Sequence, residues 1–341
     1  MKRDDINCSW AACRERDSDR IRECATKELE MDSLERQFEG HLALAFVNCD
    51  GSQTPLAISH FRDAMFLVDE TGSFGHMRLC LVHGLIQREL GEHTLTVHLI
   101  EKYNEAIAEM MDPAESALSL ELLGMAFFRM GRSADAHELW ADAERCAQET
   151  GGGTRVGFIL GWHAVAYLHQ QRWQDAAEYF ARSEDVYRAI GPAFRGTYAS
   201  AGLAAARAKL GDPVQEIAPL QRAVRLAEAK FHIRQESLWL RYLGETLLAV
   251  GDVEGALEAL QRSAEISLRC RLYGRMRATR DLIIDHLSKS RDDRLLGNYR
   301  EYHQLEQRMV AQSLTDRETS LQLLESIREW NRKNSIAMLE V

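Results

Sequence analysis

The sequence predicts an all-α fold, a solenoid built from about seven helical hairpins. Strong helix formers such as alanine, leucine, glutamate and arginine are abundant, while only 5 of the 341 residues are proline. No stretch alternates β-branched and polar residues in the manner of a series of strands. Helix-ending turns recur every 40 residues, and such a fixed period is typical of repeat architectures.

The recurring turn is clearest at Gly131, which lies between two apolar-periodic stretches. Five of the seven turn positions are glycine, although the chain has only 22 glycines, and glycine suits the left-handed conformation that ends many helices. The series comprises Gly51, Gly91, Gly131, Gln171, Gly211, Gly251 and Arg291. We therefore expect one helical hairpin around each turn.

Two further positions follow the same period. Seven residues before the turn stands a small residue, which would let two helices approach closely, and nine residues after it stands a large apolar one. The small residues are Gly84, Gly124, Ala164, Ala204 and Gly244. The large residues are Ile100, Trp140, Phe180, Leu220 and Leu260. This pairing predicts close packing between the two helices of each hairpin.

The pattern resembles the tetratricopeptide repeat, whose signature is a small residue, an aromatic residue three positions later and an alanine twelve positions later. The clearest matches are Gly124, Phe127 and Ala136, followed by Ala164, Tyr167 and Ala176. The repeat around Gly211 departs from the signature, with Arg207 and Glu216 in two of its positions. HEAT repeats also run to about 40 residues, but the spacing favours tetratricopeptide repeats. The resemblance covers roughly residues 33–312 and implies a right-handed superhelical solenoid.

The repeat divides the chain into three segments. Residues 1–32 are predicted to be an N-terminal capping or disordered segment, residues 33–312 the repeat array, and residues 313–341 a C-terminal cap or signalling helix. The hairpins within the array are expected at residues 33–70, 74–111, 113–150, 154–190, 193–230, 232–269 and 271–312.

The C-terminal region resembles the junction in bacterial signalling proteins whose tetratricopeptide module leads through a long helix to an output domain, often a diguanylate cyclase. No such domain is expected within these 341 residues, so the chain is either a stand-alone relative or a sensory segment of a longer protein. Leu314 and Leu321 are seven residues apart, which is compatible with a homodimer through this helix. The alternative is a solvent-facing cap helix.

Charge and cysteine usage restrict the partners. The formal net charge of −10 disfavours general binding to nucleic acid or to an anionic membrane. The apolar runs are too short to span a bilayer, and the charged N-terminus does not resemble a signal peptide. The seven scattered cysteines suggest free thiols and a cytoplasmic protein.

No motif predicts catalysis or a cofactor. Phosphate-binding loops, zinc-protease helices and nucleophile elbows are all missing from the sequence. The most plausible zinc ligands would be Cys8, Cys13, Cys24 and His41, but their spacing is not that of paired zinc knuckles. We therefore predict no enzyme activity, no cofactor and no metal.

The tetratricopeptide resemblance implies that the first helix of each hairpin lines a concave groove. Carried over to this sequence, groove positions with partner-binding potential are Glu121, Met125, Phe158, Val165, Tyr198, Arg241 and Glu245. The lysines and asparagines with which some family members bind chaperone C-termini are missing here. The predicted groove is apolar in its middle, which suits an amphipathic helix or an extended peptide. The alternatives are that the C-terminal helix fills it, or that part of this surface is core.

A basic cluster lies at the start of the last hairpin. Arg271, Arg275 and Arg277 could bind a phosphate group or an acidic peptide. The alternative is a solvated face balanced by nearby acidic residues.

These features predict a cytoplasmic regulatory or scaffold protein that binds a peptide or protein segment in the groove. The first alternative is a ligand-sensing, dimerising module that controls a signalling output such as a diguanylate cyclase or a transcription regulator. A peptide-regulated transcription factor is disfavoured, because the sequence offers no DNA-binding region and is acidic.

Overall fold

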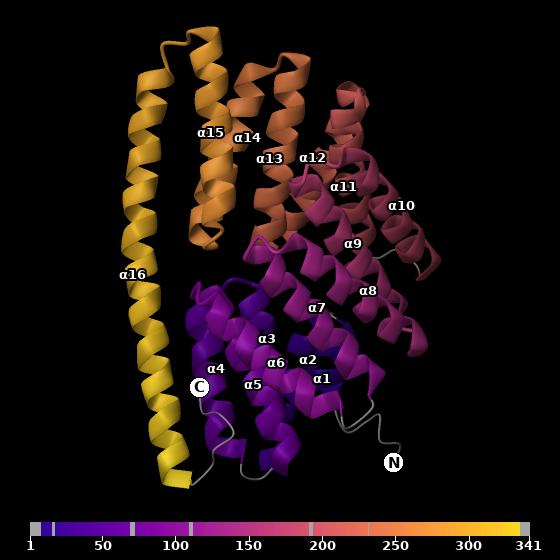
Figure 1. Ribbon diagram of the computed structural model, residues 1–341, viewed down its shortest axis with the longest axis vertical. Coiled ribbons are helices and arrows are strands. Elements are labelled where there is room, and N and C mark those ends of the chain that lie inside the picture. The colour runs from indigo at the N-terminus through magenta and orange to yellow at the C-terminus, as the bar shows by residue number, and fades with distance from the viewer. Residues whose placement is uncertain are drawn as a thin grey trace. The chain divides into compact units, whose positions relative to one another are not determined.

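The computed structural model describes residues 8–15, 18–68, 72–108, 112–190, 194–230 and 232–334. Over these ranges the secondary structure is helical, without strands, and the helices follow one another as packed hairpins (Figure 1). The predicted all-α fold is therefore confirmed. None of the described helices combines the length and the apolar character needed to cross a lipid bilayer.

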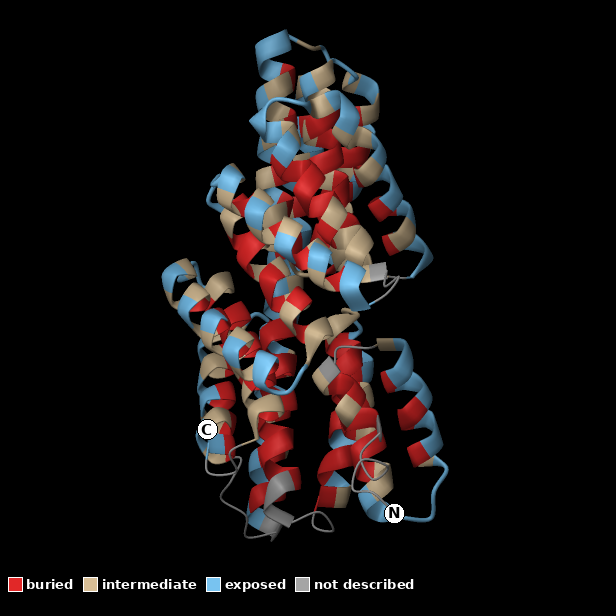
Figure 2. Ribbon diagram, turned by 90° about the vertical axis from the view of Figure 1, so that its right-hand side faces the viewer, coloured by how far each residue is buried: buried red, intermediate tan, exposed pale blue. Residues whose placement is uncertain are grey.

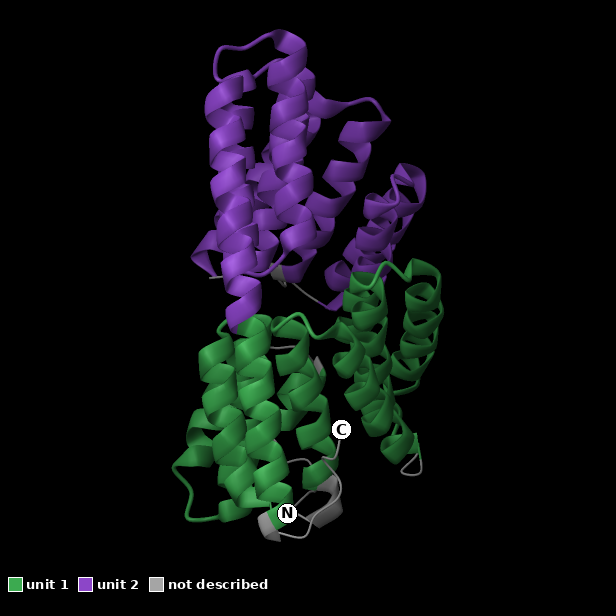
Figure 3. Cartoon of the chain, turned by 60° about the vertical axis from the view of Figure 1, so that its left-hand side comes forward, with its two compact units in different colours: residues 1–159, 316–341 green, residues 160–315 purple. Residues whose placement is uncertain are grey.

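The chain forms two compact units, shown in different colours in Figure 3. Unit 1 contains residues 1–159 and 316–341. Its helices are α1 (Cys8–Glu15), α2 (Ser18–Leu29), α3 (Leu34–Asp50), α4 (Thr54–Leu67), α5 (Gly72–Glu89), α6 (His93–Ala108), α7 (Pro113–Arg129) and α8 (Ser133–Glu149).

Unit 2 contains residues 160–315. Its helices are α10 (Trp173–Ile190), α11 (Phe194–Leu210), α12 (Pro213–Ala229), α13 (Ile233–Val250), α14 (Val253–Arg269) and α15 (Tyr273–Ser290). Two further helices, α9 (Gly153–His169) and α16 (Leu295–Asn334), contribute residues to both units. The second helix of the last predicted hairpin and the C-terminal helix are thus one continuous helix of 40 residues.

The turns between paired helices follow the predicted period. Gly91, Gly131, Gly211 and Gly251 all have positive φ. Gln171 and Arg291 also adopt positive φ, at 59° and 53°, although a Cβ disfavours this conformation. In the first hairpin Gly51 has φ of −78° and the left-handed residue is Ser52. The repeat geometry therefore imposes the turn conformation even where the residue is not glycine.

Buried residues alternate with intermediate and exposed ones along the helices (Figure 2). Within hairpins, the predicted small and large residues meet. A Cβ added to Gly124 would lie 2.4 Å from Trp140 Nε1, and one added to Gly244 would lie 2.5 Å from Leu260 Cγ. The fully buried Trp140 ring also donates a hydrogen bond of 3.1 Å to the Glu121 carbonyl oxygen. The large residue of the second helix is thus seated directly on the first helix.

Successive hairpins also contact each other through a large side chain packed on a glycine. A Cβ on Gly202 of α11 would come within 2.2 Å of the Phe180 ring of α10. Phe180 belongs to the predicted series of large residues, whereas Gly202 lies outside the predicted series of small ones. Phe180 therefore packs against the next hairpin, and it belongs to the same buried cluster as Ala164 of its own hairpin.

The N-terminal helix α1 joins the core of unit 1 through Trp10, which is fully buried. Trp10 Nε1 donates to Glu115 Oε1 at 2.9 Å, and Arg78 bridges Glu115 and Glu39 with distances of 3.0 and 2.7 Å. Burial of the Glu39 carboxylate raises its pKa, against the opposing effect of the Arg78 charge. Removing Arg78 would leave two buried carboxylates without their shared cation, which is strongly destabilising.

Five of the cysteines that the structure describes are free thiols. The expectation of free thiols is wrong for Cys24, which is disulfide-bonded. Cysteine spacing alone does not report which sulfur atoms the packing of the helices brings together.

The Gly124–Trp140 contact predicts a specific loss of stability. Gly124→Ala should lower the free energy of unfolding by about 1–3 kcal/mol, because the new methyl group overlaps a rigid, buried indole ring. Gly161→Ala is the matched control, since its added Cβ would meet only Ser183 Oγ, at 4.0 Å. The control should be neutral or stabilising by up to about 1 kcal/mol. Urea unfolding followed by circular dichroism measures both, and a Gly124→Ala protein as stable as wild type would contradict the proposed seating.

Candidate functional site

The predicted groove positions in unit 1 lie mostly in its interior. Glu121 is 0% exposed and its Oε2 is 2.5 Å from Arg155 Nη1. Met125 is 6% exposed, and only Phe158 of these three is partly exposed. Because Glu121 is already paired with a buried cation, it cannot bind a partner without disrupting the core of unit 1.

The predicted positions in unit 2 are more accessible. Val165 and Tyr198 are partly exposed, and both pack on the buried apolar cluster that contains Ala201 and Ala205. The Tyr198 hydroxyl is hydrogen-bonded to His232 Nδ1 at 2.9 Å, and its ring stacks on Trp239 with a centroid distance of 6.3 Å. The result is a fixed apolar area with a polar edge.

Charged side chains gather next to this area, on the first helices of successive hairpins. Glu245 of α13 accepts from Arg241 of the same helix at 2.9 Å and from Lys209 of α11 at 2.6 Å. The Lys209 ammonium also lies 5.9 Å from the centroid of the Trp173 ring. Glu245 is thus a largely buried carboxylate held between two cations.

Arg275 of α15 adds a third cation. Its Nη1 donates to the Arg234 carbonyl oxygen and to Ser237 Oγ, each at 2.9 Å, while its buried Nε has no hydrogen-bond partner. Burial and then the neighbouring Arg241 charge lower the pKa of Arg275 to about 10. The guanidinium therefore stays charged at pH 7 and holds one unused donor.

His169, at the end of α9, lies in the field of the same charges. Desolvation of its ring and then the positive charges of Arg275 and Arg241 lower the pKa of His169, although the residue as a whole is exposed. We call Lys209, Arg241, Glu245, Arg275 and His169 the Glu245 cluster. It holds three cations and one carboxylate, and its local charge is therefore positive in a chain whose formal net charge is −10.

The three arginines predicted to bind an anion lie in different surroundings. Arg275 faces α13, as its bonds to Arg234 and Ser237 show. Arg277 is exposed and its Nε lies 3.3 Å from Glu306 of α16. Arg271 occupies the turn before α15 with φ of 57°. Neighbouring arginines on one helix therefore serve different surfaces.

Lys209 and His169 were missed by the sequence interpretation. The signal that could have found them is the repeat itself, because both stand five residues after the small residue of their hairpin, at Ala164 and Ala204. Repeat-equivalent positions on successive first helices point to the same side of the array, and a polar residue at two such positions marks a shared surface.

No protein-family model matches the sequence, and no curated protein matches it. Solved structures do match. A Rap protein complexed with Competence and Sporulation Factor aligns with a TM-score of 0.62 and 11% identity, covering 90% of this chain and 98% of that one. NprR in complex with its cognate peptide NprX aligns with a TM-score of 0.58 and 14% identity, covering 90% and 89%. These likenesses define the fold as a tetratricopeptide-like repeat of the Rap and NprR kind.

A third match is the Rap conjugation gene regulator of the plasmid pLS20 in complex with the Phr* peptide. It has a TM-score of 0.58 and 14% identity, and covers 86% of this chain and 76% of that one. At such identities the similarity extends to the fold and does not reach individual site residues.

Proposed function

We propose that this chain is a cytoplasmic regulatory protein that binds a peptide or protein segment on the first-helix surface of unit 2. The observation that carries the proposal is the Glu245 cluster, in which Lys209 of α11 and Arg241 of α13 both pair with Glu245 and the charge of Arg275 of α15 interacts with that of Arg241. The partner would place an anionic group on this cluster and apolar side chains on the area around Val165 and Tyr198.

The chemistry of the cluster favours a carboxylate as the anionic group. Arginine forms strong charge-assisted hydrogen bonds with carboxylates, and Arg275 offers a buried Nε donor without a partner. A partner carboxylate would bring a second negative charge to a cluster of three cations in which Glu245 is paired with Lys209 and Arg241. The C-terminus of a peptide, or an acidic side chain within it, would supply that charge.

The structural matches support peptide binding as the function. NprR is in complex with its cognate peptide, and the pLS20 Rap regulator is in complex with the Phr* peptide. Both share the fold of this chain over most of their length. We propose the same type of ligand here and no catalytic role.

The cytoplasmic assignment is part of the proposal. It is supported by the five free cysteines among the described residues, because structural disulfides are rare in the cytosol. The bonded Cys24 is the opposing observation.

The peptide-binding proposal predicts a selective loss of affinity. A synthetic peptide library, made once with free C-terminal carboxylates and once with amidated C-termini, is screened against the wild-type protein by fluorescence polarisation. Arg241→Gln combined with Arg275→Gln should weaken the selected peptide by about 10- to 100-fold, since a hydrogen bond to a charged group contributes about 1.5–3 kcal/mol. Arg277→Gln is the control, because it removes an exposed arginine of the same helix that faces Glu306.

Equal loss of affinity in the control and the double variant would show that the cluster is not the site. Circular dichroism confirms that each variant is folded. Failure of both libraries to yield a binder would count against peptide binding itself.

A second function, a dimerising sensor module, is favoured by the outer face of α16. Val310, Leu314 and Leu321 of this helix are 53%, 65% and 55% exposed. Leu323, Ile327 and Trp330 on another face are buried. The exposed side chains are spaced by four and seven residues, which is the spacing of a short coiled-coil seam. We propose that this stripe pairs two copies of the chain.

If this stripe pairs two copies of the chain, negative charges placed in it should separate the dimer into monomers. Sedimentation equilibrium should give a dimer for the wild type and a monomer for Leu314→Glu combined with Leu321→Glu, because two buried carboxylates would face each other across the seam. Ser313→Glu combined with Gln322→Glu adds the same charge at exposed neighbouring positions and should remain dimeric. A monomeric wild type at tens of micromolar would rule the proposal out.

A further inference from the structure

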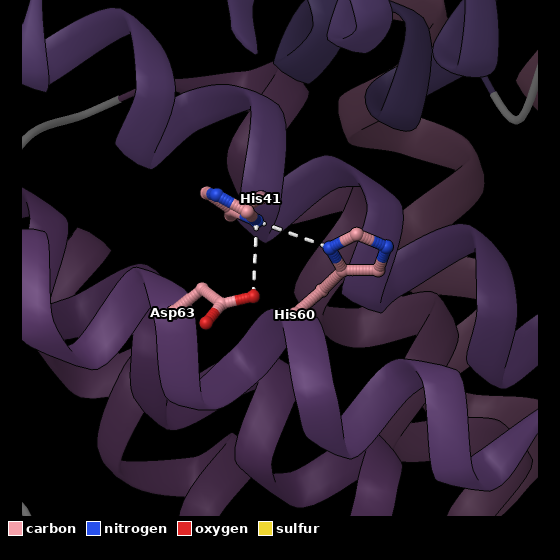
Figure 4. A group of neighbouring side chains, drawn as sticks. All are labelled: His41, His60 and Asp63. Atoms are coloured by element: carbon pink, nitrogen blue, oxygen red, sulfur yellow. Dashed lines mark hydrogen bonds and ion pairs between the residues drawn. The ribbon is translucent and has the colours of Figure 1, made fainter.

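Two histidines and an aspartate converge between α3 and α4 of unit 1, remote in sequence from the residues of the Glu245 cluster. His41 Nδ1 lies 3.0 Å from His60 Nδ1 and 3.6 Å from Asp63 Oδ2. One ligand atom from each of the three residues lies within 4.8 Å of the others. Figure 4 shows the three side chains pointing toward one another from the two neighbouring helices.

The packing of the two helices fixes this arrangement. His60 and Asp63 are three residues apart on α4, so they lie on one face of the helix. The residue that follows each of the three in the sequence is fully buried: Leu42 after His41, Phe61 after His60 and Ala64 after Asp63. The core therefore anchors the backbone on both sides of the cluster, and the three side chains are placed at its partly exposed edge.

The spacing of the donor atoms suits a transition metal. Zinc binds imidazole nitrogen at about 2.0–2.1 Å in tetrahedral geometry, so two coordinated nitrogens lie about 3.3 Å apart. The observed separation of 3.0 Å needs a change of only a few tenths of an ångström. Imidazole donors select zinc-like ions over calcium or magnesium, which prefer oxygen donors. The carboxylate offsets part of the charge of the ion.

The protonation of the rings is compatible with metal binding. Burial lowers the pKa of His41 and of His60, while the nearby Asp63 carboxylate opposes the shift in both. Neutral imidazole is the form that coordinates a metal. In the metal-free protein one ring can donate to the other through a single shared proton, and a metal ion would replace that proton.

We propose that His41, His60 and Asp63 form a binding site for a divalent ion of the zinc type, with water at the remaining coordination position. The proposal goes beyond the peptide-binding function and does not depend on it. It differs from the sequence-based prediction of no metal, which considered His41 only together with cysteines. Nothing in the linear spacing indicated the site, because His60 stands 19 residues from His41 on another helix.

The test is titration of chelator-treated full-length protein with Zn²⁺ by isothermal calorimetry. Wild type should bind one equivalent in this site, and His60→Ala should bind it at least about tenfold more weakly. His303→Ala is the control, because His303 is a histidine on α16 that contacts Gln307, another α16 residue. Asp63→Asn serves as the second variant if His60→Ala unfolds, since Asp63 is exposed.

Co²⁺ distinguishes this site from binding by the cysteines. The Co²⁺ protein should show visible ligand-field bands without the intense near-ultraviolet charge-transfer band of a thiolate, and His60→Ala should lose those bands. Unchanged Zn²⁺ affinity in His60→Ala or Asp63→Asn would overturn the proposal, as would a thiolate band that His60→Ala retains. Peptide binding should persist in His60→Ala, which separates this proposal from the previous one.

Discussion

The fold depends on the close seating of a large side chain of the second helix against a small residue of the first. Trp140 on Gly124 and Leu260 on Gly244 show this contact directly, at separations that leave no room for a Cβ. Such a contact fixes the distance between the paired helices and the rotation of each about its own axis. With the inward faces occupied in this way, each hairpin buries its apolar surface against its neighbours, which stabilises a repeat array.

This constraint also decides where function can reside. The seated residues use one face of each first helix, so the adjacent face is free to vary without loss of the core. In unit 2 that face carries Tyr198 and the Glu245 cluster, in which Lys209 and Arg241 come from successive first helices. When a binding surface is formed by several hairpins, the packing of the hairpins determines its geometry. Its specificity depends on side chains that are not needed for that packing.

Much of the fold could be predicted from the sequence, because equivalent positions in successive hairpins have the same structural role and therefore carry similar residues. The turn positions, the small residues and the large residues all follow one period, and the structure adopts left-handed turns even at Gln171 and Arg291. The first turn departs by one residue, because the left-handed conformation falls on Ser52 and Gly51 has a negative φ. The bonded state of Cys24 could not be predicted, since it depends on how α2 packs.

The candidate sites were less predictable, because they depend on pairs of residues from different helices. The burial of Glu121 follows from Arg155, which is 34 residues later. The separation of Arg275 from Arg277 follows from the rotation of α15 between two neighbours. The group of His41, His60 and Asp63 exists only because α3 packs on α4. The periodicity of the sequence predicts which face of a helix a residue occupies. It does not predict which side chain of a neighbouring helix that residue contacts.

We propose that the first helices of unit 2 bind a peptide. The most direct measurement is amide hydrogen exchange of the wild-type protein with and without a peptide selected from the library. Peptide binding at the Glu245 cluster should slow exchange in α11, α13 and α15, with α12 and α14 little changed. Protection confined to α12 and α14, or to unit 1, would contradict it.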